Sequence, residues 1–334
     1  MIPPVASRFV AGETEAEALD RVRRLNEDGL GGMVNRLGTH HDDPWRVSAD
    51  AAAYRELVAA IGETGLEGAV SVKPTQLGLD LGEDVFRRCL ESVLAVASDR
   101  DVVVWLDMEE RTTTDATLEA FEAFAPSYGD SGLGVCLQAN LKRTPADLDR
   151  LADVPGRLRL VRGGAYDEPR SVAYRDPERM ARAYRDVLER AFESFEGPIA
   201  VATHDLTIIE YATELGECHG TTLEVQMLMG VRPTVQRELA SEYDVDQYVP
   251  YGSRWKRYFL NRLTENEHTL RVALRALLGR GDRASGAPSD RQYPITHGAS
   301  AVDRRPRTAV ARGSAGGRRS RRAARGRPRR SRHR

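Results

Sequence analysis

Several features that would mark a membrane or secreted protein are missing from this 334-residue sequence. No stretch approaches the roughly 18 uninterrupted apolar residues that a membrane-spanning helix needs, and no basic-then-apolar signal sequence follows Met1. The cysteines are three, an odd number, and their scattered positions (Cys89, Cys136 and Cys218) predict neither a disulfide framework nor a zinc site. We therefore expect a cytoplasmic protein without a metal centre, whose cysteines are small buried residues.

Lysine is also scarce, because only Lys73, Lys142 and Lys256 occur among 49 basic residues. The near-neutral total charge hides two unlike parts. Residues 281–334 contain 16 arginines and three aspartates, whereas residues 1–280 contain 33 basic and 47 acidic side chains. The sequence thus predicts an acidic folded body, residues 1–280, and a basic tail, residues 281–334.

The tail has too few large apolar residues to offset the entropy lost on folding, so we expect it to be disordered. Its arginines could neutralise nucleic-acid phosphates. Aromatic residues are not interleaved with them, however, and we do not expect nucleic acid to be a partner. A reading-frame change in a GC-rich gene would produce the same composition.

The body alternates short β-branched or apolar runs with longer segments of helical period, which predicts a parallel sheet in an α/β fold. Eight strand-then-helix units within about 250 residues favour closure into a (β/α)8 barrel of the TIM type. The main alternative is a doubly wound open sheet, which is disfavoured because no Gly-x-Gly-x-x-Gly turn follows a strand. Ala16, Leu19, Val22 and Leu25 predict an additional short N-terminal helix that caps the bottom of the barrel. The expected strands span residues 30–37, 68–73, 102–107, 134–138, 157–161, 199–203, 223–227 and 247–250.

The helices expected after these strands begin near Ser48 in the first unit and at Pro177 in the fifth, where Asp176 is the predicted cap. Residues 235–243 and 255–278 are predicted as the last two helices.

Polar side chains gather where the expected strands end, and in a barrel these ends share one rim, where active sites form. Some of these residues also have an ordinary structural explanation: Lys73 as a solvated lysine at the rim, Asp107 as its ion-pair partner, and His204 as a cap for the next helix. The convergence of so many polar types on one rim nevertheless predicts a functional site. The residues are Lys73, Asp107, Gln138, Arg159, Arg162, Thr203, His204, Glu224, Gln226 and Tyr248.

A set of short motifs, in order between about Arg8 and Leu278, resembles the proline dehydrogenase (proline oxidase) family. No single motif carries the resemblance, which makes it specific. The motifs are Arg8-Phe-Val-Ala-Gly-Glu13, Ser71-Val-Lys-Pro-Thr-Gln-Leu-Gly78, Leu106-Asp-Met-Glu109, Gln138-Ala, Arg159-Leu-Val-Arg162, Gly164-Ala-Tyr166, Ala202-Thr-His-Asp205, Glu224-Val-Gln-Met-Leu228 and Tyr248-Val-Pro-Tyr-Gly252.

The resemblance implies a distorted (β/α)8 barrel that binds FAD, oxidises L-proline to 1-pyrroline-5-carboxylate and passes electrons to a membrane quinone. It therefore implies a peripheral contact with the inner face of the membrane. The catalytic residues that it implies are Lys73, Asp107, Tyr248 and Arg262. Substrate contacts are implied for Lys73, Tyr166, Tyr248, Asn261 and Arg262. Cofactor contacts are implied for Gln138, Arg159, Arg162, Gly164, Tyr166, Thr203, His204 and Glu265.

Two departures from the family pattern bear on the site. Asn261 stands where the first of two arginines is expected, so the substrate carboxylate would lose one charged donor. Arg162 replaces a lysine, and one extra residue precedes Tyr166. Two rival functions stay open: an aldolase-like barrel in which Lys73 forms a Schiff base, and a catalytically impaired barrel with a nucleic-acid-binding tail.

Overall fold

The computed structural model describes residues 2–129 and 132–265. The predicted boundary at residue 280 and the arginine-rich segment 281–334 therefore lie outside the described residues. The same holds for residues 266–278 of the last predicted helix.

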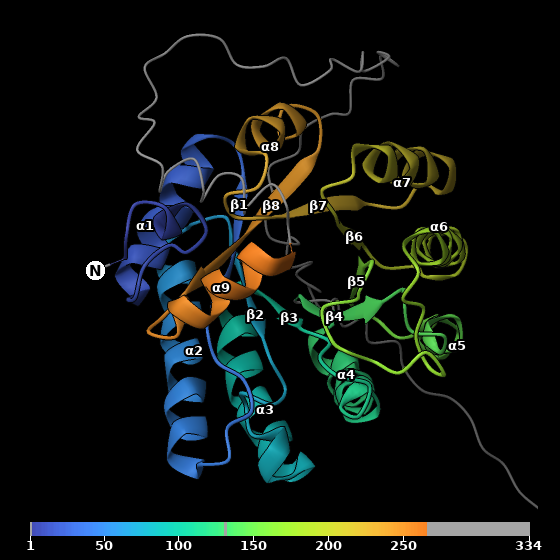
Figure 1. Ribbon diagram of the computed structural model, residues 1–334. Coiled ribbons are helices and arrows are strands. Elements are labelled where there is room, and N and C mark those ends of the chain that lie inside the picture. The colour runs from blue at the N-terminus through green and yellow to red at the C-terminus, as the bar shows by residue number, and fades with distance from the viewer. Residues whose placement is uncertain (1, 130–131, 266–334) are drawn as a thin grey trace, which may run out of the picture. The chain divides into compact units, whose positions relative to one another are not determined.

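Eight parallel strands close into a barrel in chain order, with the first strand paired to the eighth. Figure 1 shows the strands at the centre and the helices around them. This confirms the predicted (β/α)8 barrel. The strands are β1 (Gly31–Arg36), β2 (Gly68–Val72), β3 (Val103–Leu106), β4 (Leu133–Gln138), β5 (Arg157–Val161), β6 (Ile199–Ala202), β7 (Leu223–Leu228) and β8 (Asp244–Tyr251).

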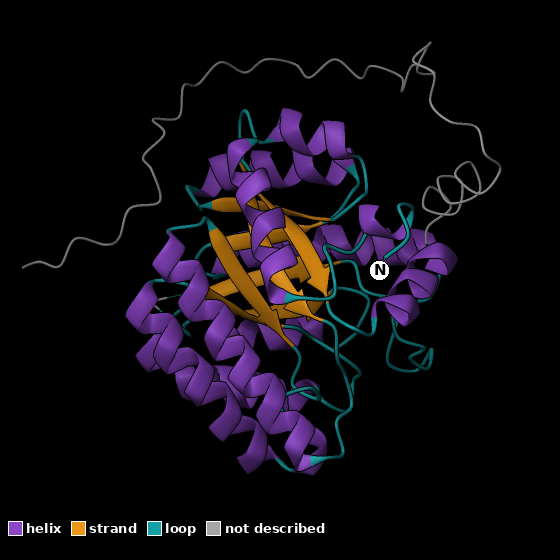
Figure 2. Ribbon diagram, turned by 90° about the vertical axis from the view of Figure 1, so that its left-hand side faces the viewer, coloured by secondary structure: helices purple, strands orange, loops and turns teal. Residues whose placement is uncertain are grey.

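Helices connect the strands and cover the outside of the barrel (Figure 2). Two short 3-10 helices, η1 (Ala6–Arg8) and η2 (Leu79–Leu81), accompany them. The α-helices are α1 (Glu15–Glu27), α2 (Pro44–Thr64), α3 (Glu83–Arg100), α4 (Thr114–Tyr128), α5 (Thr144–Leu151), α6 (Pro177–Ser194), α7 (Leu206–His219), α8 (Pro233–Leu239) and α9 (Trp255–Glu265).

The strands are buried on both faces, as expected for a parallel sheet covered by helices. Alternate residues point outward into the main core, for example Val34, Val70 and Val104. The opposite residues point into the barrel, where Met33 and Trp105 pack in a separate cluster. Side chains therefore fill the barrel interior. Most of the predicted polar residues lie at or after the carboxyl ends of the strands, but Arg159 lies in the middle of β5 and Glu224 is the second residue of β7, so their predicted place at the strand ends is wrong.

Helix boundaries follow local capping more closely than apolar periodicity. The α6 helix begins as predicted, because the Asp176 side chain accepts a hydrogen bond from the Arg179 amide and Pro177 occupies the first turn. The same Asp-Pro arrangement starts α2 at Pro44, before the predicted Ser48. The last turn of the predicted helix 235–243 is wrong, because α8 ends at Leu239.

The N-terminal helix exists, but its predicted position beneath the barrel is wrong. Helix α1 contacts β1 and β8, and Val22 occupies the space where a side chain at Gly32 would lie. Its buried face includes Ala18 in place of the predicted Ala16, which is exposed. The cysteine prediction is also only partly right, because Cys136 is buried but Cys218 is exposed.

Gly134 leaves room for Trp105 inside the barrel, since a Cβ atom at position 134 would lie 2.5 Å from two carbons of the indole ring. We expect Gly134→Ala to lower the free energy of unfolding by about 1–3 kcal/mol, because a rigid ring must move in a packed core. Urea unfolding followed by tryptophan fluorescence measures this loss.

Gly216→Ala is the matched control, because Gly216 lies in a helix and its added Cβ would meet nothing closer than 3.3 Å. Equal stability losses in the two variants would contradict the close packing of Trp105 on β4.

Candidate active site

The Asp107 carboxylate is the centre of the polar cluster at the rim. Asp107 follows β3 and is 6% exposed. Its Oδ2 atom lies 2.6 Å from the Lys73 ammonium and accepts a 3.3 Å hydrogen bond from the Tyr248 hydroxyl. Its Oδ1 atom accepts hydrogen bonds from the Ser71 hydroxyl and from Nη2 of Arg159. The structure thus brings Lys73, Asp107, Arg159 and Tyr248 together from four strands or strand ends.

The Arg159 guanidinium is buried inside the barrel and contacted on several sides. It lies over the ring of Trp105, 5.3 Å from the ring centroid, in a cation–π arrangement. Its Nη1 atom lies 3.1 Å from the Met33 sulfur. The Nε atom is buried and has no hydrogen-bond partner among residues 2–129 and 132–265. A buried cation with one unused donor is suited to an electron-rich or anionic group placed above it.

The charges of this cluster stabilise one another. Burial alone would raise the pKa of Asp107, but the cations of Lys73 and Arg159 outweigh it and hold the pKa well below its usual range. Burial would likewise lower the pKa of Lys73, and the Asp107 carboxylate outweighs it, so the pKa of Lys73 stands well above its usual range. Lys73 is therefore an ammonium ion at neutral pH.

Two tyrosines complete the surroundings of Lys73. Burial and then the charge of Asp107 raise the pKa of Tyr248 well above its usual range. Burial also raises the pKa of Tyr166, which lies in the connection after β5 and is half-buried. Both phenols stay protonated at neutral pH, so they can donate hydrogen bonds and present aromatic faces.

Gln138 is the last residue of β4. Its Nε2 atom donates a 2.7 Å hydrogen bond to the Glu109 carbonyl and so links the connection after β3 to the rim. The buried Glu109 side chain accepts from the hydroxyls of Thr39 and Thr75 and from the Thr75 amide. Sequence reasoning assigned no role to Glu109, although it closes the Leu106-Asp-Met-Glu109 motif. These bonds join the connections that follow β1, β2 and β3.

A histidine and two carboxylates also meet at this rim. One ligand atom from each of His40, Glu109 and Glu110 lies within 4.8 Å of the others. The imidazole already lies between Asp80 and Glu110, at 2.9 and 3.2 Å. Glu109 is engaged by the threonines. These contacts join loops to one another, and we propose no metal here.

In the connection after β5, the backbone packs closely against neighbouring side chains. Gly163 and Gly164 have φ angles of 82° and 94°, which favour glycine. A Cβ atom on Gly163 would lie 1.8 Å from Oδ1 of Asn140. The exposed Arg162 precedes them. Both glycines therefore pack against neighbouring side chains, since a Cβ atom on Gly164 would lie 2.7 Å from Cε of Met180. The buried Arg159 guanidinium fits the electron-rich ring of a flavin.

Thr203 and His204 lie between β6 and α7, on the same rim. The Thr203 hydroxyl accepts a hydrogen bond from the Asp205 amide, and Nε2 of His204 accepts from the Leu228 amide at 3.4 Å. Asp205, not His204, caps the helix, because its carboxylate accepts from the Thr207 amide. The capping explanation for His204 is therefore wrong.

Three of the predicted residues lie in α9. Asn261 is exposed there. Arg262 and Glu265 belong to the same helix, but their side chains lie outside the description. The structure therefore places the backbone of this helix, and the roles of Asn261, Arg262 and Glu265 stay predictions.

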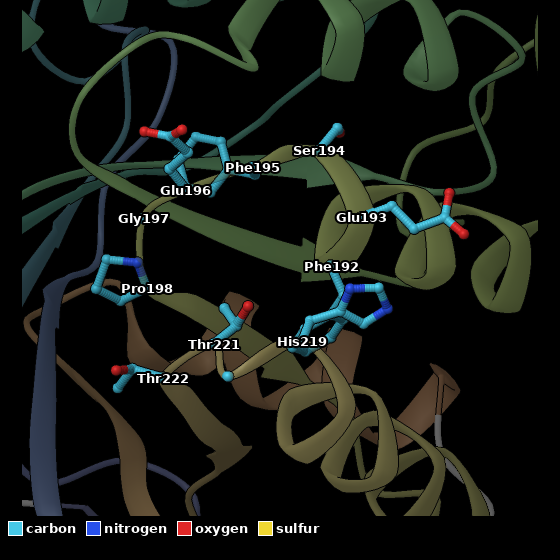
Figure 3. A pocket seen from close by; sticks show the side chains of 11 residues that line it. Phe192, Glu193, Ser194, Phe195, Glu196, Gly197, Pro198, His219, Thr221 and Thr222 are labelled. Carbon is cyan, nitrogen blue, oxygen red and sulfur yellow. The ribbon is translucent and has the colours of Figure 1, made fainter.

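A surface hollow occurs at the other end of β6 and β7, between the connections that precede these strands (Figure 3). Phe192, Phe195, His219 and Thr221 line it, and the Glu193 carboxylate points away from it in Figure 3. None of the residues predicted for the site lies there. The polar rim around Asp107 remains the candidate active site.

Within residues 2–129 and 132–265, no helix is both long enough and apolar enough to cross a membrane.

Replacing Asp107 tests the charge balance of the site. We expect Asp107→Asn to lower the free energy of unfolding by about 3–5 kcal/mol, because Lys73 and Arg159 then lack their shared carboxylate. Urea unfolding at neutral pH gives the value. The control Asp149→Asn breaks an exposed ion pair with Arg190, and its cost should stay below about 0.5 kcal/mol.

The contribution of Asp107 to the free energy of unfolding depends on pH with a definite sign. Because the pKa of Asp107 is lower in the folded protein, its stabilisation is complete above the ordinary pKa of about 4 and disappears as the pH falls toward the folded value. The unfolding free energy of the wild type should therefore fall more steeply than that of Asp107→Asn between about pH 5 and about pH 2. Parallel curves would contradict the low pKa.

Comparison with known proteins assigns the chain to a family. Residues 18–272 match the family described as proline dehydrogenase. Proline dehydrogenase 1 of Bacillus subtilis (strain 168) is 35% identical over 277 residues, which are 82% of this chain and 90% of that protein. The proline dehydrogenase of Deinococcus radiodurans is 33% identical over 281 residues, with the same coverage.

The solved structure of proline utilization A from Bdellovibrio bacteriovorus, inactivated by N-propargylglycine, superposes with a TM-score of 0.71 at 21% identity. The match covers 83% of this chain and 34% of that one, and it supports the barrel fold. Together with the family match, these relatives show that the chain belongs to the proline dehydrogenase family.

Proposed function

We propose that the cluster around Asp107 is the active centre of a flavin-dependent proline dehydrogenase that oxidises L-proline to 1-pyrroline-5-carboxylate. The observation that carries the proposal is the pairing of one buried carboxylate with Lys73 and Arg159 on the barrel rim. Family membership supports a flavin cofactor and proline as substrate. We propose FAD as the flavin.

The bound flavin would supply the hard chemistry by accepting a hydride from the proline carbon beside the nitrogen. The chain's own residues orient the reactants and supply charge. Arg159 would place a positive charge beneath the ring, and Asp107 keeps that charge fixed. Tyr248 would cover the proline ring and exclude water, and its hydroxyl is held by Asp107. Lys73 would hold its ammonium group toward the substrate.

The remaining contacts are proposed from their positions. Gln138, Arg162, Gly164, Thr203 and His204 lie at or after the ends of β4, β5 and β6, and Arg159 lies within β5. From these positions they could hold the ring and the phosphates of FAD. Tyr166 could contact both cofactor and substrate. In α9, Arg262 would bind the substrate carboxylate beside Asn261, and Glu265 would contact the cofactor.

The electron acceptor is proposed to be a quinone, which would require a peripheral contact with the inner face of the membrane by a cytoplasmic protein. The catalytic unit is proposed to comprise residues 1–280, with residues 281–334 as an accessory tail.

Neither rival function is favoured. A Schiff base requires a neutral lysine amine. Asp107 instead holds the pKa of Lys73 well above its usual range, so the amine stays protonated. The family match extends over residues 18–272 and does not support a barrel that has lost its activity.

The direct test is the absorption spectrum of the purified protein. We expect a yellow protein whose flavin band bleaches when L-proline is added without oxygen, because the cofactor then receives the hydride. D-Proline is the control and should bleach it more slowly. A colourless protein that cannot be reconstituted with FAD, or a flavin that L-proline does not reduce, would refute the proposal.

Asn261 offers a test of the substrate carboxylate site. We expect Asn261→Arg to tighten proline binding by about tenfold or more, because a charged hydrogen bond contributes roughly 1.5–3 kcal/mol and about 1.4 kcal/mol is tenfold. The dissociation constant is measured by titration of the flavin spectrum with a non-reducible proline analogue.

The control Leu260→Arg adds the same charge at the neighbouring position, which is 59% exposed. If both variants tighten binding equally, the effect is long-range attraction and Asn261 does not face the carboxylate.

A further inference from the structure

Ser71 lies at the centre of the Asp107 cluster but has no role in the reaction proposed above. It belongs to β2, two residues before Lys73, and is completely buried. Its hydroxyl donates a hydrogen bond to Oδ1 of Asp107. The Oγ atom of Ser71 also accepts hydrogen bonds from Nη1 and Nη2 of Arg159, at 3.3 and 3.4 Å. Ser71 therefore contacts both the shared carboxylate and one of its two cations.

The geometry of the Arg159–Asp107 pair is unusual for these groups. Arginine and a carboxylate commonly form two parallel hydrogen bonds that engage both carboxylate oxygens. Here Arg159 reaches only Oδ1, through Nη2, and its Nη1 atom meets the Ser71 oxygen. Oδ2 is consequently left to Lys73 and Tyr248.

We propose that Ser71 is a positioning residue that keeps Arg159 on Oδ1 of Asp107 and thereby leaves Oδ2 to Lys73. By accepting from the guanidinium, it takes the place of the second carboxylate oxygen. Without this hydroxyl, Arg159 would turn toward Oδ2 and compete with Lys73 for it. The inference deepens the proposed function, because it explains how one carboxylate serves two cations of the same site.

The consequence appears in the protonation of Lys73. The groups that influence it are Asp107, Tyr248, Tyr166 and Glu109, and Asp107 is the one in contact with the ammonium, at 2.6 Å. Burial favours the neutral amine. A weaker interaction between the Asp107 carboxylate and the Lys73 ammonium therefore lowers the pKa of Lys73. The amine then becomes more reactive toward acylating reagents.

Because the chain has only three lysines, each can be followed separately by peptide mass spectrometry. We would label the full flavin-loaded protein at about pH 9 with acetic anhydride and, in parallel, with the larger trinitrobenzenesulfonate. Below the pKa, the labelling rate rises about tenfold for each unit by which the pKa falls, because only the neutral amine reacts. Lys142 and Lys256 serve as internal references.

In Ser71→Ala we expect the rate for Lys73 to rise about tenfold with both reagents, while the reference lysines keep their rates. Ser71→Thr retains the hydroxyl and should restore the wild-type rate. Ser71→Cys, with a weaker acceptor of similar size, should give an intermediate rise and replaces the alanine variant if that variant does not fold. The control Thr117→Ala removes a buried hydroxyl from α4 and should change nothing.

An unchanged Lys73 rate in both Ser71→Ala and Ser71→Cys would overturn the proposal. So would a rise confined to the larger reagent, which would indicate a widened opening and no change in charge. The alkaline limb of the pH profile for proline oxidation should move to lower pH in Ser71→Ala at equal flavin content. If the wild type reduces no flavin with proline, the proposed function fails, and the labelling still decides the role of Ser71.

Discussion

The structure depends on one constraint: two cations share a single carboxylate in a place that water hardly reaches. Asp107 and Arg159 are 6% and 4% exposed, and the Lys73 side chain is 22% exposed. Charges so buried are tolerated only when they are paired and hydrogen-bonded. Each member of the cluster therefore helps to hold the others in place.

The closed barrel makes this arrangement available. Ser71 and Lys73 come from β2 and its end, Asp107 follows β3, and Arg159 and Tyr248 come from β5 and β8. In an open sheet these positions would not surround one point. A glycine elsewhere in the barrel also supports this cluster. Gly134 leaves room for the Trp105 ring, and the Arg159 guanidinium lies over that ring.

Much of the fold followed from the sequence because buried parallel strands and amphipathic helices have distinct periods. The eight strand-then-helix units and the polar rim were predicted for this reason, and the Lys73–Asp107 pair was expected from neighbouring strand ends. Helix limits were less well predicted, as Pro44 and Leu239 show, because caps and turns decide them. The predicted buried face of α1 was wrong at Ala16. The apolar residues of this segment also fit a helix face that includes Ala18, which is the buried one.

The supporting contacts were not predictable in the same way. Ser71 looks like any strand serine, and its importance follows from side-chain hydrogen bonds with Asp107 and Arg159, which are distant in the sequence. The bond of Glu109 to Thr39 spans 70 residues. The His40 contacts likewise join distant loops.

We expect Lys73 and Asp107 to act as one unit in the oxidation of proline. The most direct measurement is a double-mutant cycle on the rate of anaerobic flavin bleaching by L-proline, with Lys73→Met, Asp107→Asn and the combined variant at equal flavin content. We expect strong coupling, so that the combined variant is barely slower than the slower single variant. Rate losses that simply multiply would show that the two residues act independently and would rule out a joint role.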